Sequence, residues 1–134
     1  MLKMIQARRP AEDGTYSQRT KHGMISVIIH EVGHNFFPMI INSDERQWTW
    51  MDEGLNTFVQ FLAEQEFDRD YQSRRGSARD ITSYMGGDKK RISPIMTNSE
   101  SIYQFGPNAY GKPCTALNIP VSYTHLTLPT NREV

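Results

Sequence analysis

The first strong hydrophobic pattern along the chain lies between residues 17 and 37. Apolar residues there recur three or four positions apart, which is the spacing of one face of an α-helix. Ser17 or Thr20 can cap the start of this helix, and Pro38 helps to end it. We therefore predict a helix from Ser17 or Thr20 to about Phe37, with one face buried. The residues of that face are Met24, Val27, Ile28, Phe36 and Phe37.

A second helical pattern begins near Asp52 and continues to about Phe67. Its apolar positions also repeat at the helical period, so we predict that this stripe packs in the core. The members of the stripe are Leu55, Phe58, Val59, Leu62 and Ala63. Because a single loop separates the two predicted helices, the chain has to fold back only once to place them side by side.

The second half of the chain is more polar, and its pattern is weaker. Residues 68–84 have the composition of a surface helix, residues 86–91 that of an exposed turn, and residues 92–97 that of extended chain. A final helix is predicted from Asn108 to Ile119, and Pro113 is compatible with it only near the first turn. The predicted fold class is therefore mainly α.

The two ends of the chain differ from its middle. Residues 1–16 are polar and rich in turn-forming residues, as expected for a linker or the remnant of an upstream element. Helical periodicity is lost after Ile119, and residues 120–134 resemble translated adapter sequence, so we expect a non-native tail there. An edge strand with alternating Thr and Leu is the other interpretation of this segment. We expect residues 17–119 to form the folded part and the chain to be a fragment of a longer protein.

Composition narrows the classes of function only slightly. The 134 residues suit one domain, and the formal net charge of zero gives no electrostatic argument for binding nucleic acid or an anionic membrane. No run approaches the ~20 apolar residues of a membrane span, and no secretory hydrophobic stretch is present. The one cysteine, Cys114, permits no internal disulfide and is expected to act as a small apolar residue. Compartment and oligomeric state stay open, a periplasmic or secreted parent protein included.

Candidate chemistry is concentrated in residues 30–34, which read HEVGH. A helix advances about 3.6 residues per turn, so His30 and His34 project from one face and can share one cation. Glu31 lies at the edge of that face, where its carboxylate can reach a water molecule on the metal without being a ligand. A catalytic zinc ion usually has three protein ligands and one open position. Glu53 is the candidate third ligand and completes a site for one Zn²⁺ ion.

The competing interpretation is that His30 is an ordinary buried histidine within the apolar run 25–29, with a backbone carbonyl as its partner. Burying two histidines and two glutamates in an apolar helical neighbourhood is costly unless a cation compensates their charge. The metal site is therefore the favoured interpretation. Two further histidines carry less weight, because we expect His22 to be a surface residue and His125 to have no function.

These residues resemble the gluzincin zinc aminopeptidase family, which includes aminopeptidase N. The match rests on the HEVGH pentad, the eighteen residues between it and Glu53, and the segment 50–54, which reads WMDEG. Residues 109–113, which read AYGKP, are similar to the family's Tyr-x-Lys-Gly stretch. The resemblance spans roughly residues 14–119. It implies a thermolysin-like (gluzincin) helical catalytic domain, of which residues 17–119 would be a part.

The resemblance also implies that the Tyr110 hydroxyl donates to the oxyanion of the tetrahedral intermediate. Chemistry supports the same role, since a phenol with a pKa of about 10 stays protonated at neutral pH and can donate there. Two positions depart from the family pattern, with Asp52 in place of the commoner Asn and Pro113 in place of the commoner Gly. The family's Gly-x-Met-Glu-Asn segment, which binds the free amino group of the substrate, has no counterpart in this chain.

The sequence thus predicts a zinc-dependent metallopeptidase that acts on peptide or protein substrates, with an aminopeptidase as the specificity that the resemblance implies. The residues assigned to it are Glu31 and Tyr110 as catalytic groups and His30, His34 and Glu53 as metal ligands. A thermolysin-like endopeptidase is the near alternative, although only His125 is available as the downstream histidine that such an enzyme uses. A non-catalytic, zinc-stabilised peptide-binding module and a helical interaction domain without metal are the alternatives outside the enzyme class.

Overall fold

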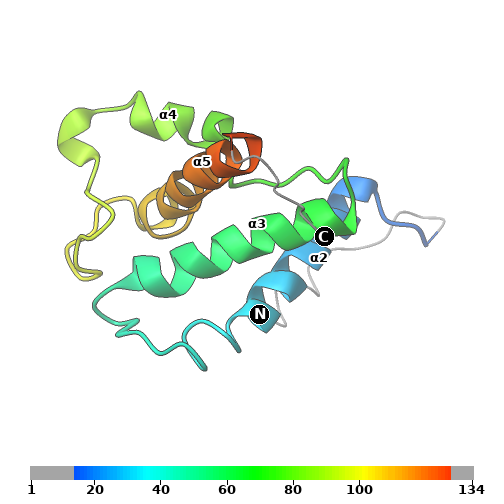
Figure 1. Ribbon diagram of the computed structural model, residues 1–134, viewed down its shortest axis with the longest axis horizontal. Coiled ribbons are helices and arrows are strands. Elements are labelled where there is room, and N and C mark those ends of the chain that lie inside the picture. The colour runs from blue at the N-terminus through cyan, green and yellow to red at the C-terminus, as the bar shows by residue number, and fades with distance from the viewer. Residues whose placement is uncertain (1–13, 128–134) are drawn as a thin grey trace.

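The computed structural model describes residues 14–127, and in this range the chain is mainly helical and contains no strand. Its framework is formed by α2 (Gln18–Gly33), α3 (Leu55–Phe67) and α5 (Lys112–Thr127). α3 lies between the other two helices and contacts both (Figure 1). The predicted mainly-α class is therefore confirmed. The shorter elements are two π-helical turns, η1 (Trp50–Gly54) and η4 (Gly106–Gly111), two 3₁₀ turns, η2 (Ala78–Ile81) and η3 (Lys89–Arg91), and α4 (Thr82–Met85).

The start of α2 follows the prediction, whereas its end does not, and Met24, Ile28 and Phe36 of the predicted buried face are exposed. The Ser17 side chain accepts a hydrogen bond from the Thr20 backbone N–H at 3.2 Å, so Ser17 is the N-cap. The helix ends at Gly33, before the predicted end at Phe37, and turns follow it. The backbone N–H groups of Phe36 and Phe37 both donate to the Gly33 carbonyl. The residue before a proline disfavours helical backbone, which explains why the helix does not continue to Phe37.

The prediction for α3 was correct about its end at Phe67, but the helix begins at Leu55 and only part of the predicted apolar stripe is covered. Val59 and Leu62 of the predicted apolar stripe are 41% and 42% exposed, whereas Asn56 and Glu64 are at most 2% exposed. The side of α3 that faces the interior is thus polar. Buried polar groups need hydrogen-bond partners, and most on this side find them in α2, in α3 itself and in the chain after α3, whereas Oδ1 of Asn56 has none.

Residues 68–84 do not form the single surface helix that their composition predicts. They form turns as far as Ser77 and then the short elements η2 and α4. Gly76 adopts a φ of +115°, which a regular helix cannot accommodate, and a Cβ at this position would overlap the Phe61 ring. Ser77 then starts η2 with a capping box formed with Asp80.

The last helix also differs from its predicted range of Asn108–Ile119. Residues 106–111 form η4, and α5 runs from Lys112 to Thr127 with Pro113 in its first turn, where proline is tolerated. The edge-strand interpretation of the segment after residue 120 is therefore wrong as far as Thr127. The predicted linker lies outside the described residues up to residue 13, as does the predicted tail from residue 128. The His125 side chain is likewise outside the described part.

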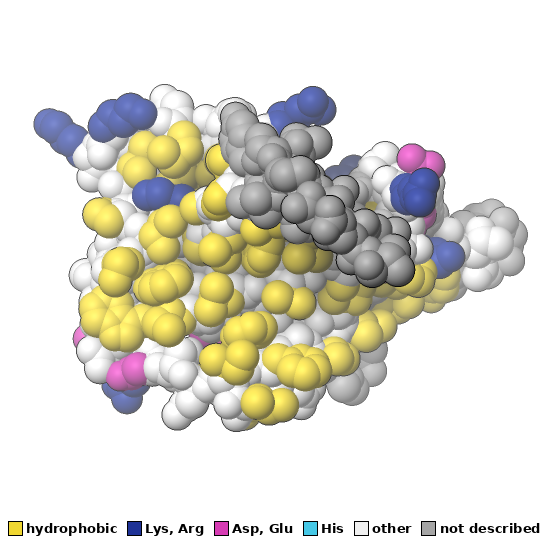
Figure 2. Space-filling model, in the orientation of Figure 1, with side chains coloured by type: hydrophobic (Ala, Val, Ile, Leu, Met, Phe, Trp, Pro, Cys, Tyr) yellow, Lys and Arg dark blue, Asp and Glu magenta, His cyan; other side chains and the backbone are white. Residues whose placement is uncertain are grey.

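The buried apolar side chains of the described residues are few. Tyr71, Tyr84, Ala109 and Cys114 are buried, as are Pro38 and Pro113, and the full burial of Cys114 is consistent with its expected role as a small apolar residue. Figure 2 shows hydrophobic side chains spread over the face that α2 and α3 present in this view. The exposed apolar residues of these two helices are Met24, Ile28, Val32, Val59, Leu62 and Phe67. Across the described range, no helix combines the length and the hydrophobicity needed to cross a membrane.

His22 is buried, which contradicts its predicted position at the surface. It is 6% exposed, and its ring stacks on Tyr71 with 4.2 Å between the ring centroids. Its Nε2 atom lies 3.5 Å from Oδ2 of Asp68, and the Tyr71 hydroxyl donates to the His22 carbonyl. These contacts fasten the first half of α2 to the chain that follows α3.

Candidate metal centre

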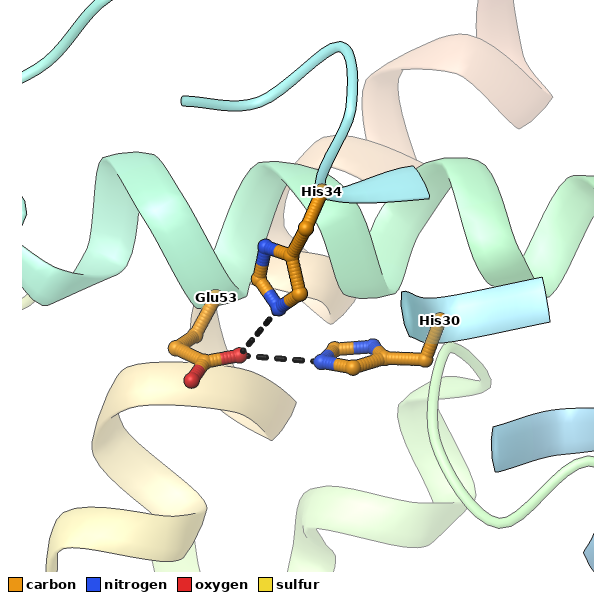
Figure 3. A group of neighbouring side chains, drawn as sticks. All are labelled: His30, His34 and Glu53. Carbon is orange, nitrogen blue, oxygen red and sulfur yellow. Dashed lines mark hydrogen bonds and ion pairs between the residues drawn. The ribbon is translucent and has the colours of Figure 1, made fainter. Parts of the chain in front are cut away.

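The three predicted ligands meet at one point of the fold (Figure 3). Oε2 of Glu53 lies 2.9 Å from Nε2 of His30 and 3.4 Å from Nε2 of His34. One ligand atom from each residue lies within 4.8 Å of the other two. Two atoms that each lie 2.0–2.1 Å from a zinc ion in tetrahedral geometry are about 3.3 Å apart. The observed spacing therefore fits three ligands of one metal ion.

The ligands come from two elements with different geometry. His30 lies in the last turn of α2, and His34 is the C-cap residue, whose backbone N–H donates to the His30 carbonyl. Glu53 lies in η1, the π-helical turn that leads into α3, and not in a regular first helical turn. A π-helical turn is rare and frequently occurs at functional sites. Tyr110 lies in the second such turn, η4, which contacts η1.

Gly33 allows α2 to approach α3 closely next to the ligands. A Cβ at this position would overlap Oδ1 of Asn56, which belongs to the buried polar side of α3. The Asn56 side chain donates to the His30 carbonyl at 2.7 Å. The next residue, Thr57, donates its hydroxyl hydrogen to the Glu53 carbonyl at 2.6 Å. The backbone of His30 and that of Glu53 are thus both anchored to α3.

Hydrogen bonds at Nδ1 orient both imidazole rings. Nδ1 of His30 lies 2.8 Å from Oε1 of Gln60, and Nδ1 of His34 lies 2.8 Å from the Phe37 carbonyl oxygen. Oδ1 of Asp52 is also 3.0 Å from Nδ1 of His34, without forming a hydrogen bond. In metal sites, such contacts at the second ring nitrogen fix the tautomer and the direction of the ligating nitrogen. Here both Nε2 atoms point toward Glu53.

The pKa values of these groups reflect their mutual contacts. Burial disfavours the charged form of His30, but hydrogen bonds with Glu53 and Gln60 outweigh this effect and raise its pKa above 6.5. Burial alone would raise the pKa of Glu53, but its hydrogen bonds with His30 and Tyr110 outweigh burial and lower that pKa. Burial and the charge of Glu53 raise the pKa of Asp52 to about 6. The site therefore contains two adjacent carboxyl groups, Asp52 and Glu53, whose negative charge a bound cation would balance.

Of the two predicted catalytic residues, Tyr110 contacts the metal ligands, whereas Glu31 is linked to them only through its charge. Tyr110 belongs to the cluster: its ring stacks on His30 with 5.8 Å between centroids, and burial and its hydrogen bond with Glu53 raise its pKa above 10. The phenol is therefore protonated at neutral pH. Glu31 is exposed on α2, and its charge contributes to the raised pKa of His30, so its carboxylate lies within electrostatic reach of the site.

Four residues of this neighbourhood carry no role in the sequence-based prediction. Asp52 enters that prediction only as a departure from a family pattern. The guanidinium of Arg75 lies 4.6 Å from the Tyr110 ring centroid. Gln60 and Glu64 lie behind His30. A usable signal exists for these last two, because they continue at helical spacing from Glu53 along a polar stripe of α3.

In comparisons with known proteins, no family model matched the chain, and neither a curated protein nor a solved structure matched it. The site therefore has to be interpreted from its own geometry and chemistry. Its described residues include one group of three side chains that could hold a metal ion.

Proposed function

We propose that this chain belongs to a zinc-dependent metallopeptidase that hydrolyses peptide bonds. The observation that carries the proposal is the convergence of His30, His34 and Glu53, with one ligand atom from each within 4.8 Å of the others. Two imidazole nitrogens and one carboxylate oxygen form a ligand set found in catalytic zinc sites, which keep a further position open for water or substrate. A protonated phenol beside this set adds a donor for an oxyanion.

Each side chain then has a defined task. His30, His34 and Glu53 would hold the zinc ion, which when bound supplies Lewis-acid chemistry that polarises the scissile carbonyl and activates water. Glu31, exposed at the edge of the site, accepts the proton of the attacking water and passes it to the leaving amine. The Tyr110 hydroxyl donates a hydrogen bond to the oxyanion that develops on the substrate.

The finer parts of the proposal rest on sequence resemblance. The HEVGH and WMDEG segments and Tyr110 support a thermolysin-like, gluzincin architecture and an aminopeptidase that removes N-terminal residues. The substrate is then a peptide or protein.

The decisive test is Glu31→Gln in the zinc-reconstituted chain. The substitution keeps the size of the side chain but removes the proton acceptor, so we expect full zinc content and a loss of peptide hydrolysis of about 10²-fold or more. Glu53→Ala should instead lose the metal, measured by elemental analysis. The matched control is Glu66→Gln, an exposed glutamate of α3, which should change neither.

Three outcomes would contradict the proposal. Wild-type protein that takes up no zinc would exclude a metal centre. Zinc uptake without hydrolysis of any peptide would favour a non-catalytic, zinc-stabilised module. Activity retained by Glu31→Gln would show that Glu31 is not the general base.

A further inference from the structure

A row of polar side chains, half-buried except for the buried Glu64, lies directly behind His30. Gln60 stands next to Nδ1 of His30, and its Nε2 atom donates to Oε1 of Glu64 at 2.7 Å. The Ser73 hydroxyl donates to the other carboxylate oxygen of Glu64, and Nε2 of Gln65 donates to Ser73 Oγ at 3.1 Å. Glu64 is only 2% exposed. The row therefore connects a buried carboxyl group to the candidate ligand through direct hydrogen bonds.

With Glu64 ionised, chemistry sets the direction of each hydrogen bond in this row. A carboxylate can only accept, so the Gln60 amide must turn its NH₂ group toward Glu64. Its carbonyl oxygen then faces His30 and can only accept from Nδ1–H. A neutral imidazole that carries its proton on Nδ1 has a free lone pair on Nε2. That is the nitrogen that faces Glu53 and His34 in the candidate metal centre.

We propose that Glu64, acting through Gln60, is a positioning group that holds His30 in the Nδ1–H tautomer and keeps Nε2 available for the metal. This inference rests on the proposed function, because it assigns a role relative to the zinc ion of that site. Groups that support metal-ligating histidines from behind typically change metal affinity by 10–100-fold when removed. This role would explain why Glu64 is buried without a cationic partner in the row, since it sets the orientation of the Gln60 amide.

The chain offers an isosteric test of this direction. In Glu64→Gln, the Ser73 hydroxyl keeps its acceptor if the new amide oxygen faces it, and the new NH₂ group then points at residue 60. Gln60 has to accept there and turns its own NH₂ toward Nδ1 of His30, which requires the proton on Nε2 and blocks the metal. We expect the zinc dissociation constant to increase by about 10-fold or more.

A double variant reverses the two groups and should restore the site. In Gln60→Glu with Glu64→Gln, the carboxylate at residue 60 accepts from both Nδ1–H of His30 and the amide at residue 64. The amide oxygen at residue 64 still accepts from Ser73. All partners are again satisfied with His30 in the required tautomer, so zinc affinity should return to within about threefold of wild type or exceed it.

The measurements are zinc titration calorimetry of the full chain and long-range ¹H–¹⁵N spectra of His30 in its zinc-loaded form. The spectra should show a protonated Nδ1 and a metal-bound Nε2 in wild type and in the double variant. Glu66→Gln is the control, since it makes the same change at an exposed position of the same helix. A purely structural role of Glu64 predicts no recovery in the double variant, and its effect would be visible in the unfolding transition of the metal-free protein.

The outcomes separate this inference from the proposed function. Equal zinc affinity in wild type, Glu64→Gln and the double variant overturns the inference and leaves a metallopeptidase possible. The expected order of affinities without peptide hydrolysis supports the inference and overturns the proposed function. A wild-type chain that binds no zinc overturns both.

Discussion

At Asp52, burial and a neighbouring negative charge both oppose ionisation. Its side chain is 14% exposed, and its Oδ1 atom is buried without a hydrogen bond although His34 Nδ1 is 3.0 Å away. The Phe37 carbonyl already takes the hydrogen bond from that nitrogen. With Glu53 next to it in the chain, Asp52 resists ionisation, and its pKa rises from 3.8 to about 6. Asp52 therefore changes the electrostatics of the site, and its exchange for the family's commoner Asn would have an effect.

Asp52→Asn should stabilise the metal-free protein at neutral pH. A carboxyl group whose pKa is higher in the folded state binds more protons when folded, so its ionisation reduces stability as pH rises from about 3.8 to 6. The amide removes this effect, and we expect a gain of about 1–2 kcal/mol at pH 7 and none at pH 3.5. Urea unfolding with a chelator at both pH values measures it, with Asp70→Asn as the exposed control. A gain that is equal at both pH values would show that ionisation is not its cause.

Tyr110→Phe should affect catalysis and not metal binding. The ring that stacks on His30 is retained, whereas the hydroxyl that we propose as donor to the oxyanion is lost. Removing one such donor typically lowers kcat by about 10²–10³-fold. Steady-state kinetics with a chromogenic peptide and zinc analysis of the same samples check this expectation. A parallel loss of zinc and activity would assign Tyr110 to the structure of the site instead.

At the scale of elements, glycines set the separation between the helical segments. A Cβ at Gly33 would overlap Asn56, and a Cβ at Gly54 would overlap Pro113 and lie 2.9 Å from the Ala109 carbonyl oxygen. Gly33→Ala and Gly54→Ala should therefore each destabilise the fold by about 1–3 kcal/mol, as overpacking does. Gly106→Ala is the matched control, because nothing lies within 4 Å of its added Cβ. Thermal unfolding of the three variants decides, and equal midpoints would show that the helices can move apart freely.

The sequence predicted the elements with strong periodicity and the residues with distinctive chemistry. Helices at α2 and α3, the Ser17 cap and the apolar character of Cys114 could be derived because each depends on local pattern or residue type. The convergence of the three candidate ligands followed from one helical face and one return of the chain. The range 68–84 could not be derived, since its path depends on a positive φ at Gly76 that composition does not reveal.

The orientation of α3 was missed for a different reason. Hydrophobic periodicity assigns the apolar side of a helix to the core, and this assumes that the core is apolar. In this chain the interior next to α3 contains the imidazoles and their supporting groups, so Asn56 and Glu64 turn inward while Val59 and Leu62 remain exposed. A polar stripe in register with a candidate ligand is the sequence signal that outweighs apolar periodicity here.

On the scale of the whole molecule, few apolar side chains of the described residues are buried, so a bound ion would supply a large share of stability. Free zinc at one hundred times its dissociation constant should stabilise the fold by about 2.7 kcal/mol. Zinc needs neutral imidazoles, and the pKa of His30 is raised, so protons compete as pH falls through that pKa. We expect zinc to raise Tm at pH 7.5 and to have little effect at pH 5. An equal rise of Tm at both values would place the ion on other groups.

The two π-helical turns make the site sensitive to chain length as well as to residue type. Each turn contains one residue more than an α-helical turn would hold, and Glu53 and Tyr110 lie in these wider turns. A single deletion within residues 50–54 would close the turn to ordinary α-helical geometry and change the direction in which Glu53 projects from it. Homologous chains that keep every ligand but differ by one residue in this stretch would then be unable to aim the carboxylate at the imidazoles.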